Sequence, residues 1–325
     1  MADVMSAGEP FFSPRMAARV KEKVATGNYD LVYLCGLYCS LYLDKTTATV
    51  PYVVDITDSC SLLTRSYVRQ EHRPLAKLKK YLNYVWADRY EKIHASKIRN
   101  IVMISPVDAE RIGRNCPNSK IWVLRNGVDT KYFRSHASAR PSSALLFTGV
   151  MNYPPNDEAM LHFIRNIYPL IRSRVPDVTL TIAGRNPTQE LTALAAQTTG
   201  VTVTGHVEDL RPYCDGATVY VSPLLSGAGI RNKVLEAWSM GLPVVATSDS
   251  CSGIEECDND NILIANSPDQ FSRAVIALLS DRQHCKSLSI SGRLTVEKSY
   301  MWYNRSAYLT SIFEEIPEKS ACSER

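Results

Sequence analysis

Short apolar segments alternate with amphipathic helical segments along nearly the whole chain, and this alternation constrains the fold more than any other feature. Strands separated by helices pair in parallel, because each helix returns the chain to the starting edge of the sheet. The sequence therefore predicts an α/β protein built on parallel sheets. The expected strands are 29–34, 50–55, 100–104 and 121–124 in the first part, and 144–148, 178–183, 201–204, 218–222, 242–246 and 262–264 in the second.

A stretch of small and polar residues divides the chain. Residues 135–143, SHASARPSS, are interrupted by proline and are typical of a linker between domains. At 325 residues the chain is long enough for two domains. We expect a first domain over 1–134 and a second over 135–294, followed by a helix over about 295–314 and a polar tail that ends at 325.

Composition excludes several classes of protein. The chain has 37 Lys and Arg against 33 Asp and Glu, and this net charge of +4 is too small to indicate a nucleic-acid-binding protein. No apolar run approaches the roughly 18 residues that span a membrane, and the amino terminus lacks the cation and the apolar stretch of a signal peptide. The nine cysteines contain no Cys-x-x-Cys pair, so we expect neither a disulfide framework nor a structural zinc site.

The densest group of candidate functional residues follows the expected strand 218–222. Small residues at 226–229 form a loop, and a helix is expected to begin near Arg231. Such a loop exposes backbone N–H groups at a helix N-terminus, where a phosphate binds. Arg231 and Lys233 add two cations for a diphosphate, and Glu236 can accept the hydroxyl groups of a ribose. The alternative is an ordinary junction with solvated cations, but the fixed spacing of the charged residues favours a nucleotide site.

Residues 229–247, GIRNKVLEAWSMGLPVVAT, resemble the donor-binding signature of GT4-type glycosyltransferases, which have the GT-B fold. With four further segments they resemble the bacterial exopolysaccharide sugar-transferase branch. These segments are 126–129 (NGVD), 147–156 (FTGVMNYPPN), 182–187 (IAGRNP) and 203–212 (VTGHVEDLRP). Because the motifs occur in order over most of the chain, the resemblance is specific.

The resemblance implies two Rossmann-like domains that face a cleft, with a nucleotide-sugar on the second domain and the acceptor on the first. It implies a hexosyltransferase-like transfer, with retention of configuration and without a metal or other cofactor, from a nucleoside-diphosphate sugar to a glycan or lipid-linked acceptor. The helix that begins near residue 295 would cross back to the first domain. Arg231 and Lys233 would be catalytic, because they stabilise the departing nucleoside diphosphate. The donor-binding residues would be Gly149, Asn152, Arg185, Gly229, Asn232 and Glu236.

Two features depart from the pattern of this family. Glu236 matches the second carboxylate of the family's Glu-x7-Glu pair, but Ala228 stands at the first position, so the contact of that carboxylate with the donor sugar is lost or supplied elsewhere. The family also opens with a strand and a glycine-rich loop ahead of anything that resembles residues 8–11, so we expect an amino-terminal truncation and an incomplete first domain. The alternative function is a catalytically impaired nucleotide-sugar-binding protein that results from this truncation.

Two other enzyme classes share part of the pattern. An NAD-dependent oxidoreductase is disfavoured, because no Gly-x-Gly-x-x-Gly follows an expected strand. A GT-B-fold epimerase would share the donor site, but it needs acid–base residues that the sequence does not identify.

Acidic residues outside the main cluster have less specific patterns. Asp55 and Asp58 follow an expected strand of the first domain, where related enzymes often place an acid near the acceptor. A carboxylate there would orient or deprotonate an acceptor hydroxyl, and Asp58 is our third candidate catalytic residue. The alternative is a strand-end Asp that caps the next turn. Residues 258–260 resemble an Asp-x-Asp metal site, but they lie in a polar connection that favours solvated loop acids, and we expect no metal.

Residues 64–99 combine ten Lys or Arg with interleaved Tyr and Trp in a helical region interrupted by Pro74. A basic, aromatic helix of this kind can rest on an anionic membrane and bring the enzyme to a lipid-linked acceptor. A solvated helix face is the alternative. We expect a cytoplasmic protein, with peripheral contact at the inner face of the membrane as a hypothesis.

Overall fold

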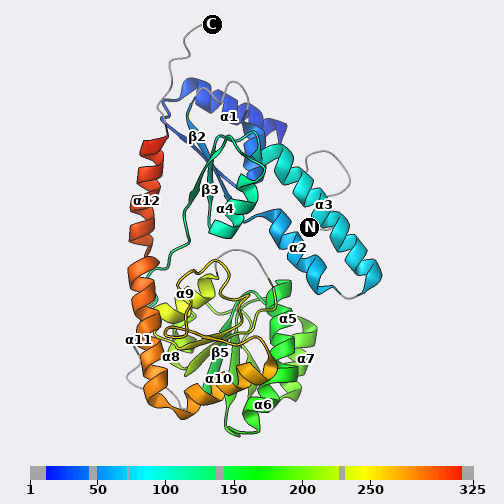
Figure 1. Cartoon of the computed structure of the whole chain (residues 1–325), viewed down its shortest axis with the longest axis vertical. Helices are drawn as coiled ribbons and strands as arrows, with labels where there is room; N and C mark the ends of the chain where they lie inside the picture. The colour runs from blue at the N-terminus through cyan, green and yellow to red at the C-terminus, as the bar shows by residue number, and fades with distance from the viewer. Residues whose placement is uncertain (1–11, 44–49, 72, 137–142, 227–230, 317–325) are drawn as a thin grey trace. The chain divides into compact units, whose positions relative to one another are not determined.

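The computed structural model describes residues 12–43, 50–71, 73–136, 143–226 and 231–316, and the chain divides into two compact units (Figure 1). Unit 1 comprises Met1–Arg125 together with Ser306–Arg325, and unit 2 comprises Asn126–Arg305. Each unit is built on one sheet, and all the strand pairs described in these sheets are parallel. The predicted α/β class with parallel sheets is confirmed.

Unit 1 is formed around a sheet with the strand order β1-β2-β3-β4. The strands are β1 (Val32–Cys35), β2 (Tyr52–Thr57), β3 (Asn100–Met103) and β4 (Lys120–Val123). The helices are α1 (Pro14–Thr26), η1 (Leu37–Tyr42, a 3-10 helix), α2 (Cys60–Gln70), α3 (Pro74–Ala95) and α4 (Pro106–Gly113). Pro74 occupies the first turn of α3, which confirms the expected interruption of the helical region. A proline is tolerated there because its missing N–H would have no partner within the helix.

Both faces of the unit 1 sheet are covered. Val54 and Ile101 pack with Ile112 of α4 on one face. On the other face, Val53 and Val102 pack against Ile312 of α12 (Trp302–Glu315). The end of the chain therefore supplies part of the core of unit 1.

Unit 2 contains a six-stranded sheet with the order β10-β9-β8-β5-β6-β7. The strands are β5 (Ala144–Thr148), β6 (Thr179–Ala183), β7 (Val201–Val203), β8 (Val219–Ser222), β9 (Val244–Ala246) and β10 (Leu263–Ile264). The helical elements are α5 (Pro154–His162), η3 (Phe163–Ile167, a π-helical turn), α6 (Tyr168–Arg172), α7 (Gln189–Gln197), α8 (Arg211–Asp215), α9 (Asn232–Ser239), α10 (Pro268–Ser280) and α11 (Arg282–Ser299).

Alternate residues of the central strand β5 enter two different cores. Leu145 and Phe147 pack in a cluster with residues of α5, η3 and α10, whereas Leu146 packs in a cluster with residues of α9 and α11. A strand that is buried on both faces is expected to be mainly apolar, and β5 is apolar up to its last residue, Thr148. The sheet of unit 2 is thus the middle layer between two layers of helices.

The strand order of unit 2 reverses between β5 and β8. From β5 the chain adds β6 and β7 on one side, and it then returns to add β8, β9 and β10 on the other. At such a reversal the loops after the two central strands diverge and leave a crevice at the carboxyl ends of the strands. The loops that follow β5 and β8 are therefore where a ligand site is expected.

Two boundaries differ from the expectation. The units divide after Arg125 rather than after residue 134, because Val128 and Phe133 pack into the core of unit 2 ahead of the polar stretch. The expected single helix over 295–314 is two helices, α11 and α12, with a break at Tyr300 and Met301. The break is held by Val128, whose N–H donates to the carbonyl of Tyr300 at 2.7 Å.

Candidate nucleotide site of unit 2

A hollow of about 590 Å³ lies at the strand-order reversal of unit 2. The loop after β5, the loop after β8 and the first residues of α9 line it. The described lining residues are Gly149, Val150, Asn152, Tyr153, Pro154, Pro155, Asn156, Leu224, Arg231, Asn232 and Lys233. The structure thus brings together five of the predicted site residues, namely Gly149, Asn152, Arg231, Asn232 and Lys233.

The amine of Lys233 has a fixed position in this hollow. Its Nζ donates to Oδ1 of Asn156 at 2.5 Å and lies 4.3 Å from the centre of the Phe147 ring. Burial, together with the nearby charge of Arg231, lowers the pKa of Lys233 to about 7. A cation that is costly to charge gains free energy when an anion approaches, so these surroundings suit the binding of phosphate.

Arg231 precedes α9 and is 9% exposed. Its charge also acts on Asp249. Burial raises the pKa of Asp249, and the charge of Arg231 partly opposes this rise. Glu236 lies one turn into α9 from Lys233; burial raises the pKa of Glu236, and the charge of Lys233 opposes that rise. Glu236 is not among the described lining residues of the hollow, but its charge acts on Lys233.

A network of buried hydroxyl groups fixes the loop after β8. Thr247 Oγ1 donates to the carbonyl of Leu224 at 2.5 Å, and the N–H of Leu224 donates to Ser250 Oγ at 3.3 Å. Ser250 Oγ in turn donates to the carbonyl of Ser222 at 2.5 Å. These bonds tie Ser222 and Leu224, where the chain leaves β8, to the turn after β9.

The remaining predicted donor residues have different positions. Arg185 is exposed and is not among the described lining residues, although its carbonyl accepts the N–H of Met151 at 2.9 Å. Gly229 lies outside the described residues, as does Ala228. Asn232 Oδ1 accepts a hydrogen bond from Nδ2 of Asn126 at 3.1 Å, which brings the segment 126–129 to the site.

Two residues of this site were missed by the sequence analysis. Asn156, which appeared only as the last residue of the segment 147–156, contacts Lys233 from the first turn of α5. A Cβ atom on Gly184 would overlap the carbonyl group of Gly149, so Gly184 allows the turns after β5 and β6 to touch. The signal for Gly184 was its place directly after a buried strand, where a glycine often marks a close approach of two backbones.

The predicted catalytic residue of the first domain, Asp58, directly follows β2 in unit 1. Its neighbour Asp55 has the turn-capping role that was the alternative for these acids. Asp55 Oδ1 accepts the N–H of Thr57 at 3.0 Å, and Oδ2 accepts the hydroxyl of Tyr33 at 2.6 Å.

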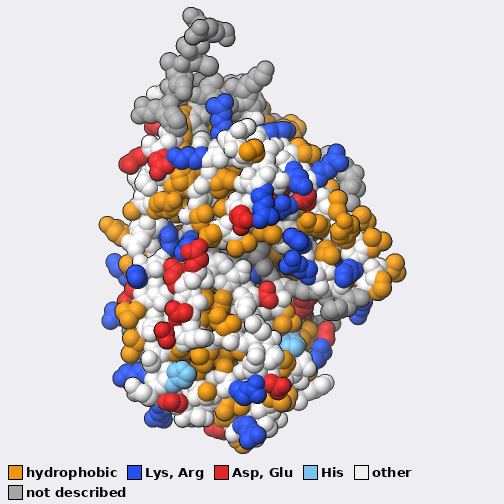
Figure 2. All heavy atoms as spheres, viewed as in Figure 1, with side chains coloured by type: hydrophobic (Ala, Val, Ile, Leu, Met, Phe, Trp, Pro, Cys, Tyr) orange, Lys and Arg blue, Asp and Glu red, His pale blue; other side chains and the backbone are white. Residues whose placement is uncertain are grey.

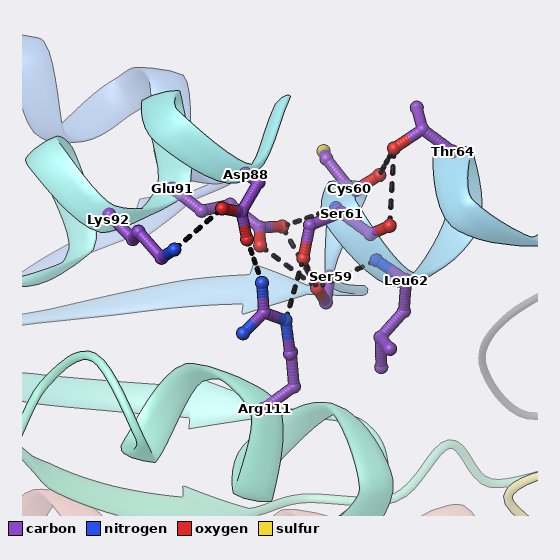
Figure 3. A network of polar contacts seen from close by, with 9 residues as sticks. All are labelled: Ser59, Cys60, Ser61, Leu62, Thr64, Asp88, Glu91, Lys92 and Arg111. Carbon is purple, nitrogen blue, oxygen red and sulfur yellow. Dashed lines mark hydrogen bonds and ion pairs between the residues drawn. The ribbon is translucent and has the colours of Figure 1, made fainter. Parts of the chain in front are cut away.

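The residues that directly follow Asp58 belong to a buried polar network with side chains of α3 and α4 (Figure 3). Glu91 of α3 is 1% exposed and accepts the N–H of Ser61 at 2.9 Å and the hydroxyl of Ser59 at 3.0 Å. Arg111 of α4 donates to Ser61 Oγ at 3.1 Å and also pairs with Asp88 of α3. A carboxylate therefore caps the N-terminus of α2, and the network joins α2, α3 and α4.

The carboxylate of Asp258 is bonded to backbone. Asp258 Oδ1 accepts the N–H groups of Asp260 and Asn261 at 2.9 and 3.1 Å. Over the part of the chain that the structure describes, no group of three or more His, Cys, Asp or Glu residues is placed to hold a metal ion. Within the same residues, no helix has the length and apolar content needed to cross a bilayer.

Unit 2 therefore has the architecture of a nucleotide-binding α/β unit, with two cations at a strand-order reversal. Comparison with known proteins agrees with this class. Residues 142–281 match the family model described as Glycosyl transferases group 1.

Two relatives are similar to the chain. One is an uncharacterized 44.6 kDa protein in the cps region of Klebsiella pneumoniae, 24% identical over 178 residues. The chain spans 45% of the length of that protein, and the match covers 53% of the chain. The other is phosphatidyl-myo-inositol mannosyltransferase of Mycolicibacterium smegmatis, 26% identical over 317 residues, which are 94% of the chain and 76% of the relative.

Among solved structures, the fold is similar to that of Anabaena HepE in complex with UDP and glucose. The TM-score is 0.69 at 14% identity, over 94% of this chain and 84% of that one. The fold is of the GT-B class, as predicted. The match to the family model lies within unit 2, and the second relative is a mannosyltransferase.

Proposed function

We propose that this protein is a GT4-type glycosyltransferase that transfers a hexose, with retention of configuration, from a nucleoside-diphosphate sugar to a glycan or lipid-linked acceptor. The observation that carries the proposal is the pair of cations, Arg231 and Lys233, that line the hollow of unit 2 at the start of α9. A helix N-terminus with two cations matches the charge of a diphosphate. No cofactor and no metal are part of the proposal.

The relatives and neighbours support the choice of donor and pathway class. The HepE structure contains UDP and glucose, so UDP is the first donor base to test. One relative is encoded in a cps region, which supports exopolysaccharide or cell-surface glycan synthesis. The other carries a lipid substrate in its name, which supports a lipid-linked acceptor.

In the proposed reaction, negative charge grows on the leaving diphosphate as the sugar departs. Arg231 and Lys233 stabilise this charge more in the transition state than in the ground state, and this difference lowers the barrier. Gly149, Asn152 and Asn232 contact the donor from the lining of the hollow, while Glu236 accepts the ribose hydroxyls. Arg185 and Gly229 complete the proposed donor contacts, and Asp58 of unit 1 orients or deprotonates the acceptor hydroxyl.

Calorimetric titration with UDP, GDP and ADP, followed by turnover assays with the matching sugars, tests the proposal. We expect one nucleotide to bind, and we expect Lys233→Ala to abolish turnover with the fold intact. Lys286→Ala is the matched control, because Lys286 is an exposed lysine of α11. Glu236→Ala should weaken nucleotide affinity by about 1.5–3 kcal/mol, the range for hydrogen bonds to a charged group.

The outcomes separate the candidates. A wild-type protein that binds none of the three nucleotides would refute the proposal. Binding that is lost in Lys233→Ala, but without sugar transfer to any acceptor, would instead support the alternative of a nucleotide-sugar-binding protein. Unchanged turnover in Lys233→Ala would remove Lys233 from the mechanism.

We also propose peripheral contact with the inner face of the cytoplasmic membrane, through the basic region 64–99. Helix α3 exposes an apolar stripe with helical spacing, formed by Leu75, Leu78, Leu82 and Val85. Leu75 is 85% exposed. Figure 2 shows hydrophobic and basic side chains side by side on the right of the view, over the α2 and α3 region. An apolar stripe flanked by cations is the pattern of a helix that lies in a membrane interface.

Flotation with anionic and with neutral vesicles tests this contact. We expect the wild type to float with anionic vesicles, and the variants Leu75→Ser/Leu78→Ser and Lys77→Gln/Lys79→Gln to float less. Lys80 is left unchanged, because it forms an ion pair with Glu71 at 2.9 Å. Ile290→Ser/Leu294→Ser, which changes exposed apolar residues of α11, is the control. Equal flotation of all variants would refute the contact.

A further inference from the structure

Asn156 connects two parts of the hollow in unit 2. Its side chain is almost fully buried, with 6% exposure, in the first turn of α5. Nδ2 donates to the carbonyl of Val150 at 2.9 Å, and Oδ1 accepts the amine of Lys233 at 2.5 Å. The amide of Asn156 therefore joins the loop after β5 to the side chain of Lys233 on α9.

The backbone of Gly149 lies close to this contact. A Cβ atom on Gly149 would lie 2.8 Å from Asn156 Nδ2 and 3.2 Å from Lys233 Nζ. Real Cβ atoms almost never come as close as the first of these distances. Together with the Phe147 ring, the loop and the amide confine the Lys233 amine on three sides.

The chemistry of an amide suits this position. A carboxylate at residue 156 would neutralise the Lys233 ammonium group, whereas an amide oxygen accepts its hydrogen bond and leaves its charge available. We infer that Asn156 is a positioning residue that fixes the Lys233 amine toward the donor diphosphate without cancelling its charge. This inference rests on the proposed function of the site.

The charged groups around Lys233 set its protonation. Arg231 lowers the pKa of Lys233 and Glu236 raises it, while burial is the largest effect and lowers it. One step further away, Tyr220 interacts with Glu236, and Asp249 interacts with Arg231. Removing the Asn156 acceptor takes a partner from the charged form, so we expect the pKa of Lys233 to fall further. Placing a carboxylate there adds an opposite charge, so we expect it to rise.

Competitive chemical labelling of Lys233, read by mass spectrometry across a pH series, tests the inference without any ligand. Asn156→Ala should shift the labelling midpoint to lower pH, and the nearly isosteric Asn156→Asp should shift it to higher pH. Asn166→Ala, which removes an exposed amide bonded to His162, should leave the midpoint unchanged. Circular dichroism checks that the variants are folded.

Calorimetry with UDP then measures the functional consequence. At neutral pH, Asn156→Ala should weaken UDP affinity about tenfold, an effect of the size of one hydrogen bond to a charged group. In the double variant Asn156→Ala/Lys233→Ala, affinity should be no weaker than in Lys233→Ala alone, because Asn156 acts through Lys233.

The two measurements distinguish failures. If the labelling midpoint of Lys233 is the same in the wild type, Asn156→Ala and Asn156→Asp, the inference is overturned, whatever UDP does. If the affinity losses of the two single variants simply add, Asn156 acts independently of Lys233 and the inference is again overturned. If the midpoints shift as expected but no nucleotide binds to the wild type, the positioning of Lys233 stands and the proposed function fails.

Discussion

At the scale of single residues, the candidate site depends on a contact between two backbones. Gly149 follows β5 and Gly184 follows β6, and the N–H of Gly149 donates to the carbonyl of Ala183 at 3.1 Å. The N–H of Met151 donates to the carbonyl of Arg185 at 2.9 Å. Because the backbone of Gly149 borders the Asn156–Lys233 pair, a shift of the turn at Gly184 would displace the lining of the hollow.

We predict that Gly184→Ala destabilises unit 2 by more than about 1 kcal/mol and weakens UDP binding. The φ of Gly184 is +148°, which disfavours a side chain, and the new Cβ would overlap the backbone of Gly149. Chemical denaturation and calorimetry measure the two effects. Gly205→Ala is the matched control, because Gly205 has a φ of +73° but no atom within 4 Å of an added Cβ. Equal losses in the two variants would show that backbone strain matters and the contact does not.

The charged residues of the site could be predicted from the sequence, but the groups that hold them could not. Arg231 and Lys233 lie two and four positions after the small-residue loop 226–229, so local spacing was enough to predict their place at the hollow. Asn156 lies 77 residues from Lys233, and its role depends on the side-by-side pairing of β5 and β8. A polar residue at a helix start has several ordinary uses, and no local pattern selects among them.

At the scale of elements, the N-terminus of α2 also has one partner that the local sequence predicts and one that it does not. Ser59 is a local cap, and its Oγ accepts the N–H of Leu62 at 3.3 Å. The second acceptor, Glu91, lies 30 residues from Ser61, near the C-terminal end of α3. The sequence showed Glu91 only as an acid in a basic region. Its burial follows from the packing of α2 against α3, which periodicity alone does not specify.

We predict that Glu91→Ala lowers the free energy of unfolding of unit 1 by about 1–3 kcal/mol. The loss follows because the buried N–H of Ser61 is left without its acceptor. Urea denaturation, followed by circular dichroism, measures it. Glu22→Ala is the control, since Glu22 forms an exposed ion pair with Arg19, and such pairs contribute about 1 kcal/mol or less. A loss in Glu91→Ala as small as that of the control would contradict the capping role.

The same carboxylate gives a prediction on pH. Burial raises the pKa of Glu91 above its ordinary value of 4.5, so the folded state binds this proton more tightly than the unfolded state. Its contribution to stability is complete below pH 4.5 and decreases as the pH rises through the folded-state pKa. Glu91→Gln cannot titrate, so the free energy of unfolding should fall less steeply with pH in this variant. Denaturation curves at several pH values measure the two slopes, and identical slopes would contradict the prediction.

At the scale of the whole molecule, the division of the chain follows packing rather than composition. The domain boundary was predicted at the polar stretch 135–143. The apolar residues Val128 and Phe133, which precede this stretch, nevertheless belong to the core of unit 2. Arg293 of α11 fastens this segment, because it donates to the carbonyls of Thr130 and Phe133 at 3.1 and 3.0 Å. The strands themselves could be predicted within a few residues, since each is a short apolar run, whereas these long-range contacts have no local signature.

Unit 1 is discontinuous in the sequence, and its core is closed by the end of the chain. Ile312 is fully buried with Val53, Val102 and Trp122, and Glu315 accepts a hydrogen bond from Trp122 Nε1 at 3.1 Å. One face of the β2–β3 pair is therefore covered by residues that follow all of unit 2 in the chain. If the packing of Ile312 on this face stabilises unit 1, its loss should destabilise the sheet of unit 1 and leave the stability of the unit 2 sheet unchanged.

We predict that Ile312→Ala costs about 2–5 kcal/mol, the range for truncating a buried isoleucine. Hydrogen exchange should show faster opening of amides in β2 and β3, and no change in β5 and β8. Ile290→Ala is the matched control, because Ile290 lies on α11 with half of its surface exposed. Similar exchange in the two variants would mean that the end of the chain rests on unit 1 without stabilising it. Faster exchange in both sheets would mean that the two units unfold together and are not independently stable.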